Sequence, residues 1–206
     1  MRRVPRWALF SSGCAPILLI GGWTIAGLLQ GPGYDPVSQT ISVLAAYGAP
    51  GSWVMTGALF GLGVCHLFTA WGLRAAALAG RVALAAGGVT ALVVALLPAP
   101  LSGGSLRHGS VAAVGFALLA VWPVLAVERA GPAPWGLRPV PAVGVTALMG
   151  LGAGWFLVDM QRHGAVGVAE RLVTCVQSVW PLVVVVSCLL YAKGGHRPPK
   201  GPASAS

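Results

Sequence analysis

Charged side chains are scarce in this sequence. Lys, Arg, Asp and Glu together make up 8% of the 206 residues, whereas soluble domains carry about 25%. Hydrophobic residues make up 56% of the chain. A chain with so little charge cannot cover its surface with groups that water solvates. The composition therefore excludes an ordinary soluble domain and indicates an integral membrane protein, with a length that suits one compact helical bundle.

Acidic side chains are the scarcest of all. The chain has 4 acidic residues against 13 Lys and Arg, which gives a net charge of +9. Such an excess can indicate a nucleic-acid partner, but here the basic residues stand in short clusters between apolar runs, as in membrane loops. We therefore expect no nucleic-acid partner. We expect membrane lipids and an apolar small molecule as partners, and the oligomeric state stays open.

Cysteine is also rare, with 4 residues that all lie inside apolar runs. They show neither the paired spacing of a metal site nor a disulfide framework. We predict that they pack as small buried residues, with no disulfide, no metal and no cofactor. They are Cys14, Cys65, Cys175 and Cys188.

Long apolar runs are what the sequence does have. A membrane-spanning helix needs about 20 apolar residues, and six runs reach or approach that length, at residues 7–30, 52–73, 82–101, 109–127, 140–158 and 172–192. The first run is too long for a signal peptide and has no clear cleavage site, so we interpret it as a retained span. The predicted fold is an all-α six-helix transmembrane bundle, residues 1–192, followed by a disordered tail at 193–206.

Basic residues predict the orientation. With the N-terminus inside, ten Lys and Arg fall in inside segments and three, Arg107, Arg162 and Arg171, fall outside. Because positive charge concentrates on the cytoplasmic side, we predict a multi-pass protein of the cell membrane with both termini in the cytoplasm.

The loop after the first run carries a second helical signal. Asp35 suits a helix N-cap, and Pro36 suits the first helical position. Apolar residues follow at helical spacing, at Val37, Ile41 and Leu44. The pattern predicts a short amphipathic interfacial helix on the outer mouth of the bundle. Asp35 can cap this helix, take part in a site, or do both.

The last run carries a polar stripe. Its members fall at helical spacing and are Glu170, Thr174, Gln177, Ser178 and Pro181. Polar groups facing lipid are costly, so the stripe should face the bundle interior. It lines a pocket that opens outward or makes hydrogen bonds between helices, and both alternatives stay open.

Acid–base residues gather near the predicted outer face. The candidate catalytic residues are Glu170, Asp35 and Asp159, with His108 as a partner base. The candidate substrate-binding residues are Arg107 and Arg171, for a phosphate or carboxylate head group, and Ser38, Ser42, Thr174, Gln177 and Ser178. Loop residues are also polar simply because water surrounds them.

Three further features carry weaker signals. Asp159, His163, His108 and Glu170 have ligand types that suit zinc, but without a short metal motif we predict no metal site. We interpret His66, which lies deeper, as a hydrogen-bonded packing residue rather than a ligand. Small residues at four-residue spacing predict close helix contacts, at Gly57, Gly61, Gly150 and Gly154.

The stretch Tyr34-Asp35-Pro36-Val37-Ser38-Gln39-Thr40-Ile41-Ser42 after a first apolar span resembles the domain-of-unknown-function 998 family of six-span bacterial membrane proteins. His108 at the start of the fourth span and Glu170-Arg171 at the start of the sixth span extend the resemblance over most of the chain. Members commonly have an acidic or other polar residue where Val43 stands. The resemblance implies a six-span architecture and no particular activity.

Two functions compete. In the first, the protein is a membrane-embedded enzyme that uses outer-face carboxylates for acid–base chemistry on a lipid or isoprenoid. Its size and span number are similar to those of small bacterial cyclases that act on isoprenoid chains, so terpenoid cyclisation is one such reaction. In the second, it is a non-catalytic membrane protein: a small carrier, an accessory subunit or a scaffold. The sequence shows no convincing repeat and no acid at mid-membrane, which disfavours an ion-coupled carrier.

Overall fold

The computed structural model describes residues 4–101, 104–129, 131–162 and 164–194. This part of the chain is helical and contains no strand. Its elements are α1 (Trp7–Leu28), α2 (Ile41–Leu44), α3 (Ser52–Gly72), α4 (Leu78–Leu96), α5 (Leu106–Leu125), the 3-10 helix η1 (Trp135–Leu137), α6 (Pro139–Arg162) and α7 (Val166–Gly194). Six of these helices are long and apolar enough to cross a membrane, so the predicted six-span bundle is confirmed.

Four helices begin earlier than the apolar runs suggest, at Leu78, Leu106, Pro139 and Val166. α7 begins at Val166 rather than at residue 172, which places Glu170 and Arg171 inside its first two turns. α4 begins at Leu78 and ends at Leu96, two residues before Pro98, because proline disfavours helical geometry in the residue before it. A helix continues past the apolar segment wherever its backbone stays hydrogen-bonded and stops short where a proline follows, so apolar runs misplace helix ends in both directions.

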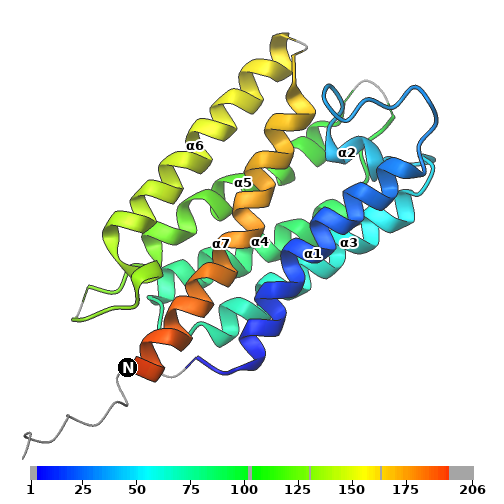
Figure 1. Cartoon of the computed structure of the whole chain (residues 1–206). Coiled ribbons are helices and arrows are strands. Elements are labelled where there is room, and N and C mark those ends of the chain that lie inside the picture. The colour runs from blue at the N-terminus through cyan, green and yellow to red at the C-terminus, as the bar shows by residue number, and fades with distance from the viewer. Residues whose placement is uncertain (1–3, 102–103, 130, 163, 195–206) are drawn as a thin grey trace, which may run out of the picture.

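The long helices form a closed ring (Figure 1). Each of α1, α3, α4, α5, α6 and α7 packs against the next, and α7 packs against α1 to close the ring. The start of α1 and the end of α7 lie at one end of the bundle, which we call the terminal end. The opposite end, the mouth end, carries the α6–α7 turn and the segment 29–51, in which α2 contacts α1, α3 and α7.

Glycine allows a close contact between α3 and α4. A Cβ atom built on Gly63 of α3 would lie 2.6 Å from the carbonyl oxygen of Gly88 on α4, and one on Gly88 would lie 2.8 Å from the oxygen of Gly63. Only residues without a side chain permit this approach, which is how helices commonly pack in lipid.

The small-residue spacing seen in the sequence predicts other contacts less well. Gly61 lies against Leu18 of α1 as expected. A Cβ atom on Gly57, Gly150 or Gly154 would meet nothing within 4 Å, so the prediction of bundle contacts at these three residues is wrong. Four-residue spacing puts residues on one helix face but does not say whether that face turns inward.

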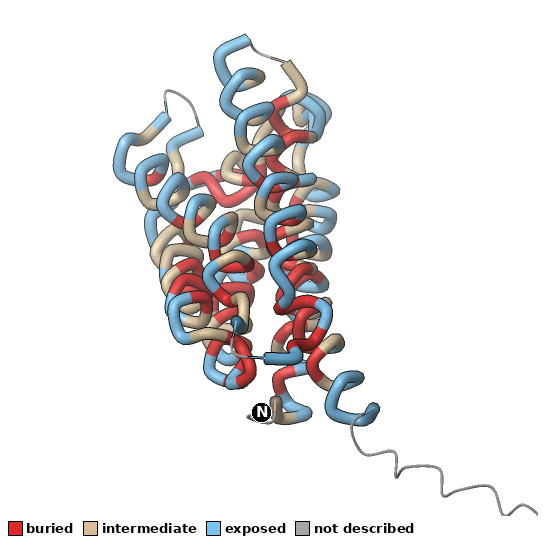
Figure 2. The backbone as a smooth tube through the Cα atoms, turned by 90° about the vertical axis from the view of Figure 1, so that its left-hand side faces the viewer, coloured by how far each residue is buried: buried red, intermediate tan, exposed pale blue. Residues whose placement is uncertain are grey.

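Buried residues follow the inner faces of the helices, and outward faces are exposed (Figure 2). Large apolar side chains such as Phe10, Ile17 and Leu151 are exposed, as expected where lipid surrounds the protein. Among the cysteines, Cys188 is buried and Cys14 is exposed, so the expectation of burial is wrong for Cys14, whose α1 position points outward. All four cysteines are free thiols.

Candidate functional site

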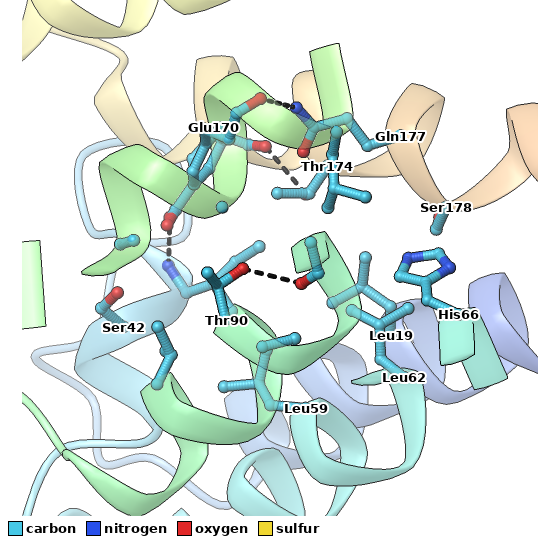
Figure 3. Close-up of a pocket in the computed structure, with 18 residues that line it drawn as sticks. Leu19, Ser42, Leu59, Leu62, His66, Thr90, Glu170, Thr174, Gln177 and Ser178 are labelled. Carbon is cyan, nitrogen blue, oxygen red and sulfur yellow. Dashed lines mark hydrogen bonds between the residues drawn. The ribbon is translucent and has the colours of Figure 1, made fainter. Parts of the chain in front are cut away.

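A cavity of about 90 Å³ lies inside the ring near the mouth end. Its walls come from α1, α2, α3, α4, α5 and α7, and among the described residues none comes from α6. Most of the wall is apolar, with Leu19, Leu59 and Leu62 on one side (Figure 3). The polar side chains that line it are Ser42, His66, Thr90, Glu170, Thr174, Gln177 and Ser178.

The polar stripe of α7 faces this cavity, as the sequence predicts. Glu170, Gln177 and Ser178 are buried. The Gln177 amide also donates a hydrogen bond of 3.0 Å to the carbonyl oxygen of Phe116 on α5. The stripe therefore lines a pocket and also makes a hydrogen bond between two helices. From Glu170 to Ser178 the stripe descends about 12 Å along the helix.

Glu170 joins α7 to α2. Its Oε2 atom accepts a hydrogen bond of 2.5 Å from the backbone N–H of Ile41, a residue 129 positions away. Ile41 is the first residue of α2, and its N–H has no acceptor within that helix. Glu170 therefore caps α2 while its carboxyl group lines the cavity.

Arg171 holds the segment that precedes α2. Its guanidinium group donates hydrogen bonds to the carbonyl oxygens of Pro36 (2.8 Å), Gln39 (3.0 Å) and Gly167 (2.9 Å), and to the Tyr34 hydroxyl group. Burial raises the pKa of the Tyr34 hydroxyl above its ordinary value. Arg171 was expected to bind a head group, but its guanidinium points to this segment and does not line the cavity.

His108 links α5 to both α4 and α2. Its Nδ1 atom lies 2.8 Å from the carbonyl oxygen of Leu97, and its Nε2 atom lies 3.0 Å from the Ser42 hydroxyl. The His108 backbone N–H donates to Oγ of Ser105, the N-cap of α5. The ring is buried with 7% of its surface exposed, so the start of α5 fixes its position against Ser42.

Asp35 lies outside the cavity and is exposed. Its carboxylate accepts hydrogen bonds from the backbone N–H of Val37 (3.0 Å) and from the Ser38 hydroxyl (2.5 Å). The Ser38 hydroxyl is the main cause that lowers the pKa of Asp35 below its usual value. Asp35 caps a turn rather than α2, so its prediction as the N-cap of a helix is wrong. The helix starts only at Ile41, because Arg171 binds the carbonyl groups of Pro36 and Gln39.

Three more predicted residues do not line the cavity. Asp159, near the end of α6, accepts a hydrogen bond of 2.9 Å from the indole N–H of Trp155. Arg107 is exposed at the start of α5, and Ser38 is exposed beside Asp35. No group of three or more His, Cys, Asp or Glu that could hold a metal occurs among the described residues. His163, which was considered as a ligand, lies outside them.

The sequence predicts that His66 is a hydrogen-bonded packing residue; it is buried as expected, but the hydrogen-bonded part of the prediction is wrong. Its ring is 1% exposed and lines the cavity. Neither ring nitrogen has a hydrogen-bond partner within the described part of the chain. Unpaired buried nitrogen atoms are costly, so the cavity has a polar group available deep inside as well as at Glu170. A histidine in an apolar span signals a site, but its sequence position alone does not show which way the ring faces.

The residues that carried the family resemblance meet at this site: the segment 34–42, His108, and the pair Glu170 and Arg171. A family model described as a protein of unknown function, DUF998, matches residues 13–187. The chain belongs to the DUF998 family. None of the curated proteins and none of the solved structures compared with this DUF998 chain matches it. Membership assigns no activity.

Proposed function

We propose that this DUF998 protein is a membrane-embedded enzyme that performs acid–base chemistry on a lipid or isoprenoid at Glu170. One observation carries the proposal: among the described residues, Glu170 is the carboxyl group that lines the cavity, and it is buried there. A buried acid next to an apolar surface is a suitable proton donor or acceptor for an apolar substrate. Asp35 and Asp159 do not take part in the proposed reaction, because they do not line the cavity.

The cavity volume limits what enters it. A volume of about 90 Å³ is smaller than that of an apolar protein cavity of about 150 Å³, which holds one benzene molecule. It accommodates the polar end group of a lipid with a few carbon atoms, and not a whole isoprenoid chain. We therefore place the reacting end of the substrate beside Glu170 and the rest of its chain outside the cavity, in the bilayer.

We further propose that the protein lies in the cell membrane with its mouth end outside and both termini in the cytoplasm. The excess of basic residues toward the terminal end supports this orientation. In a variant without its native cysteines, a cysteine at Ser38 should react with an impermeant thiol reagent in whole cells, and a cysteine at Lys193 should not. The reverse pattern would invert the orientation.

Glu170→Gln tests the catalytic role, with Asp159→Asn as the matched control. The glutamine side-chain oxygen can still accept the Ile41 N–H, so the cap on α2 is retained while the acid is lost. We expect thermal stability in detergent close to that of the parent. We expect the lipid and metabolite profile of the cells to revert to that of a deletion strain, since removing a general acid or base lowers rates by about 10²–10⁴-fold.

The matched control Asp159→Asn should keep the parent profile. A Glu170→Gln protein that also restores the parent profile would refute the catalytic role of this residue.

The competing function is a non-catalytic membrane protein, and one observation favours it. Glu170 and Arg171 both form hydrogen bonds with the segment 34–41, which is what residues that only hold this segment at the mouth end require. In that case Glu170→Gln leaves the metabolite profile unchanged, and only changes that release the segment affect the protein.

A further inference from the structure

We propose that Ser42 is a nucleophile and His108 its general base, and that the substrate class is a lipid ester or thioester. This inference rests on the proposed function, because it assumes an enzyme that acts on a lipid, and it adds the bond that is cleaved. It is carried by the hydrogen bonds of His108 and by the position of Ser42 in the cavity wall.

The Leu97 carbonyl sets the direction of the hydrogen bond between Ser42 and His108. A carbonyl oxygen only accepts hydrogen bonds, so Nδ1 of His108 carries the proton in the bond to Leu97. In the neutral imidazole, Nε2 then has a lone pair and accepts the hydroxyl proton of Ser42. This is the arrangement that a serine nucleophile and its base require, with the carbonyl group in the place of an orienting carboxylate.

The fold explains why the Leu97 carbonyl is available. Leu97 is the C-cap residue of α4, and the last carbonyl groups of a helix have no donor within that helix. Once Ser42 transfers its proton, the imidazole becomes an imidazolium, and the Leu97 oxygen continues to accept the Nδ1 proton. The same contact therefore orients the neutral ring and stabilises the charged one.

A nucleophile must be reached by the substrate, whereas its base needs to contact only the nucleophile, and Ser42 and His108 differ in this way. Ser42 lines the cavity, whereas His108 lies behind it and is buried. Glu170 binds the N–H of Ile41, the residue before Ser42. The nucleophile and the cavity acid therefore lie at the same end of the cavity, where the polar end of a lipid would enter.

The reaction balances with water as the second reactant. Ser42 Oγ bonds to the carbonyl carbon while its proton moves to His108 Nε2 and the carbonyl π electrons move onto oxygen. The carbonyl re-forms as the C–O or C–S bond breaks, and the leaving alcohol or thiol takes the proton from Nε2. Water then attacks the acyl-Ser42 ester, giving a proton to Nε2 that returns to Ser42 Oγ. The products are a carboxylic acid and an alcohol or thiol.

A dodecyl fluorophosphonate tests this assignment, because it phosphonylates activated serine residues. The full-length protein in detergent is treated with the probe, and the modified residue is located by peptide mass spectrometry. We expect modification at Ser42 of the parent. Ser42→Ala should abolish it, and His108→Gln should slow it by about 10²-fold or more, in line with the loss of a general base.

Ser110→Ala is the matched control. Ser110 lies two residues after His108 on α5, is exposed, and donates its hydroxyl proton only to the Arg107 carbonyl among the contacts described. This variant should be modified at Ser42 as fast as the parent. Because the parent itself is probed, the assignment is tested even if Ser42→Ala or His108→Gln fails to fold.

The outcomes separate this inference from the role of Glu170. No modification at Ser42 in the folded parent, or equal rates in a folded His108→Gln protein, would overturn the nucleophile. If Glu170→Gln changes the lipid profile while Ser42 stays unmodified, the acid is used without an acyl-enzyme, and only this inference fails. If Ser42 is modified while Glu170→Gln keeps the parent profile, the nucleophile stands and the role of Glu170 fails.

Discussion

α6 and α7 are neighbouring helices that differ in how much of their surface is buried and in whether they line the cavity. A short turn joins them, they pack against each other, and both are apolar enough to span a membrane. In their most apolar stretches, 44% of the residues of α7 are buried but only 17% of those of α6. α7 contributes Glu170, Thr174, Gln177 and Ser178 to the cavity. Apolar composition brings a helix into the membrane, and the placement of a few polar side chains decides which helix faces the interior.

The arginines near the facing ends of the two helices should show the largest contrast. Arg171 of α7 bonds to three carbonyl oxygens and the Tyr34 hydroxyl, whereas Arg162 ends α6 and is exposed. Arg171→Ala should lower the free energy of unfolding by about 2–3 kcal/mol, because hydrogen bonds to a charged group are lost.

Thermal unfolding in detergent measures this effect, and a decrease of about 5–10 °C in Tm is expected at this chain length. Arg162→Ala should stay within about 0.5 kcal/mol of the parent. Equal decreases in the two variants would show that the contrast between the helices is not one of stability.

Glycine to alanine changes should have opposite signs on the two helices. A Cβ atom on Gly167 of α7 would overlap the backbone oxygens of Gln39 and Pro36, whereas one on Gly150 of α6 would meet nothing within 4 Å. Gly167→Ala should cost about 1–3 kcal/mol through overpacking. Gly150→Ala should stabilise the protein by up to about 1 kcal/mol through helix propensity. The two Tm values measured side by side decide this, and a destabilised Gly150→Ala protein would indicate that α6 has a close partner at this position.

The smallest expected effect concerns Asp35, which lies in the segment bound by Glu170 and Arg171 of α7. The pKa of Asp35 lies below its usual value of 3.8, chiefly because of the Ser38 hydroxyl and with a smaller contribution from Arg171. A lowered pKa in the folded protein gives stability that is complete above the usual value and is lost as the pH falls through the folded one. Ser38→Ala removes the main cause.

The difference in Tm between the parent and Ser38→Ala should therefore be constant between about pH 7 and pH 5 and shrink toward about pH 3. Ser110→Ala, which alters no carboxylate contact, should show a difference from the parent that does not depend on pH. A Ser38→Ala difference that also persists at acid pH would mean that the hydroxyl acts independently of the Asp35 charge.

Much of the fold could be predicted from the sequence because its signals are local. Apolar length indicates the spans, and helical spacing placed Thr174, Gln177 and Ser178 on the inner face of α7. The prediction of the helix ends is less accurate. Polar residues such as Glu170 belong to α7 although they precede its apolar run.

The site could be predicted only in part, because its contacts join distant segments. No local pattern indicates that Glu170 binds Ile41, that Arg171 binds Pro36, or that His108 faces Ser42. The same limitation explains why Asp35 and Asp159 were grouped with Glu170. All three belong to segments at the mouth end, but of the three only Glu170 lines the cavity.

The order of helices around the ring has a consequence for biosynthesis. Segment 34–44 is synthesised before α5, so the contact between Ser42 and His108 requires that α5 has been made. Glu170 and Arg171, which form hydrogen bonds with this segment, belong to α7 and are synthesised later still. In the folded protein α7 lies between α6 and α1. A nascent chain that stops before α7 therefore has its serine and histidine but lacks an enclosed chamber. α7 closes the ring between α6 and α1 and supplies Glu170, so incomplete translation products lack both a wall of the cavity and its carboxyl group.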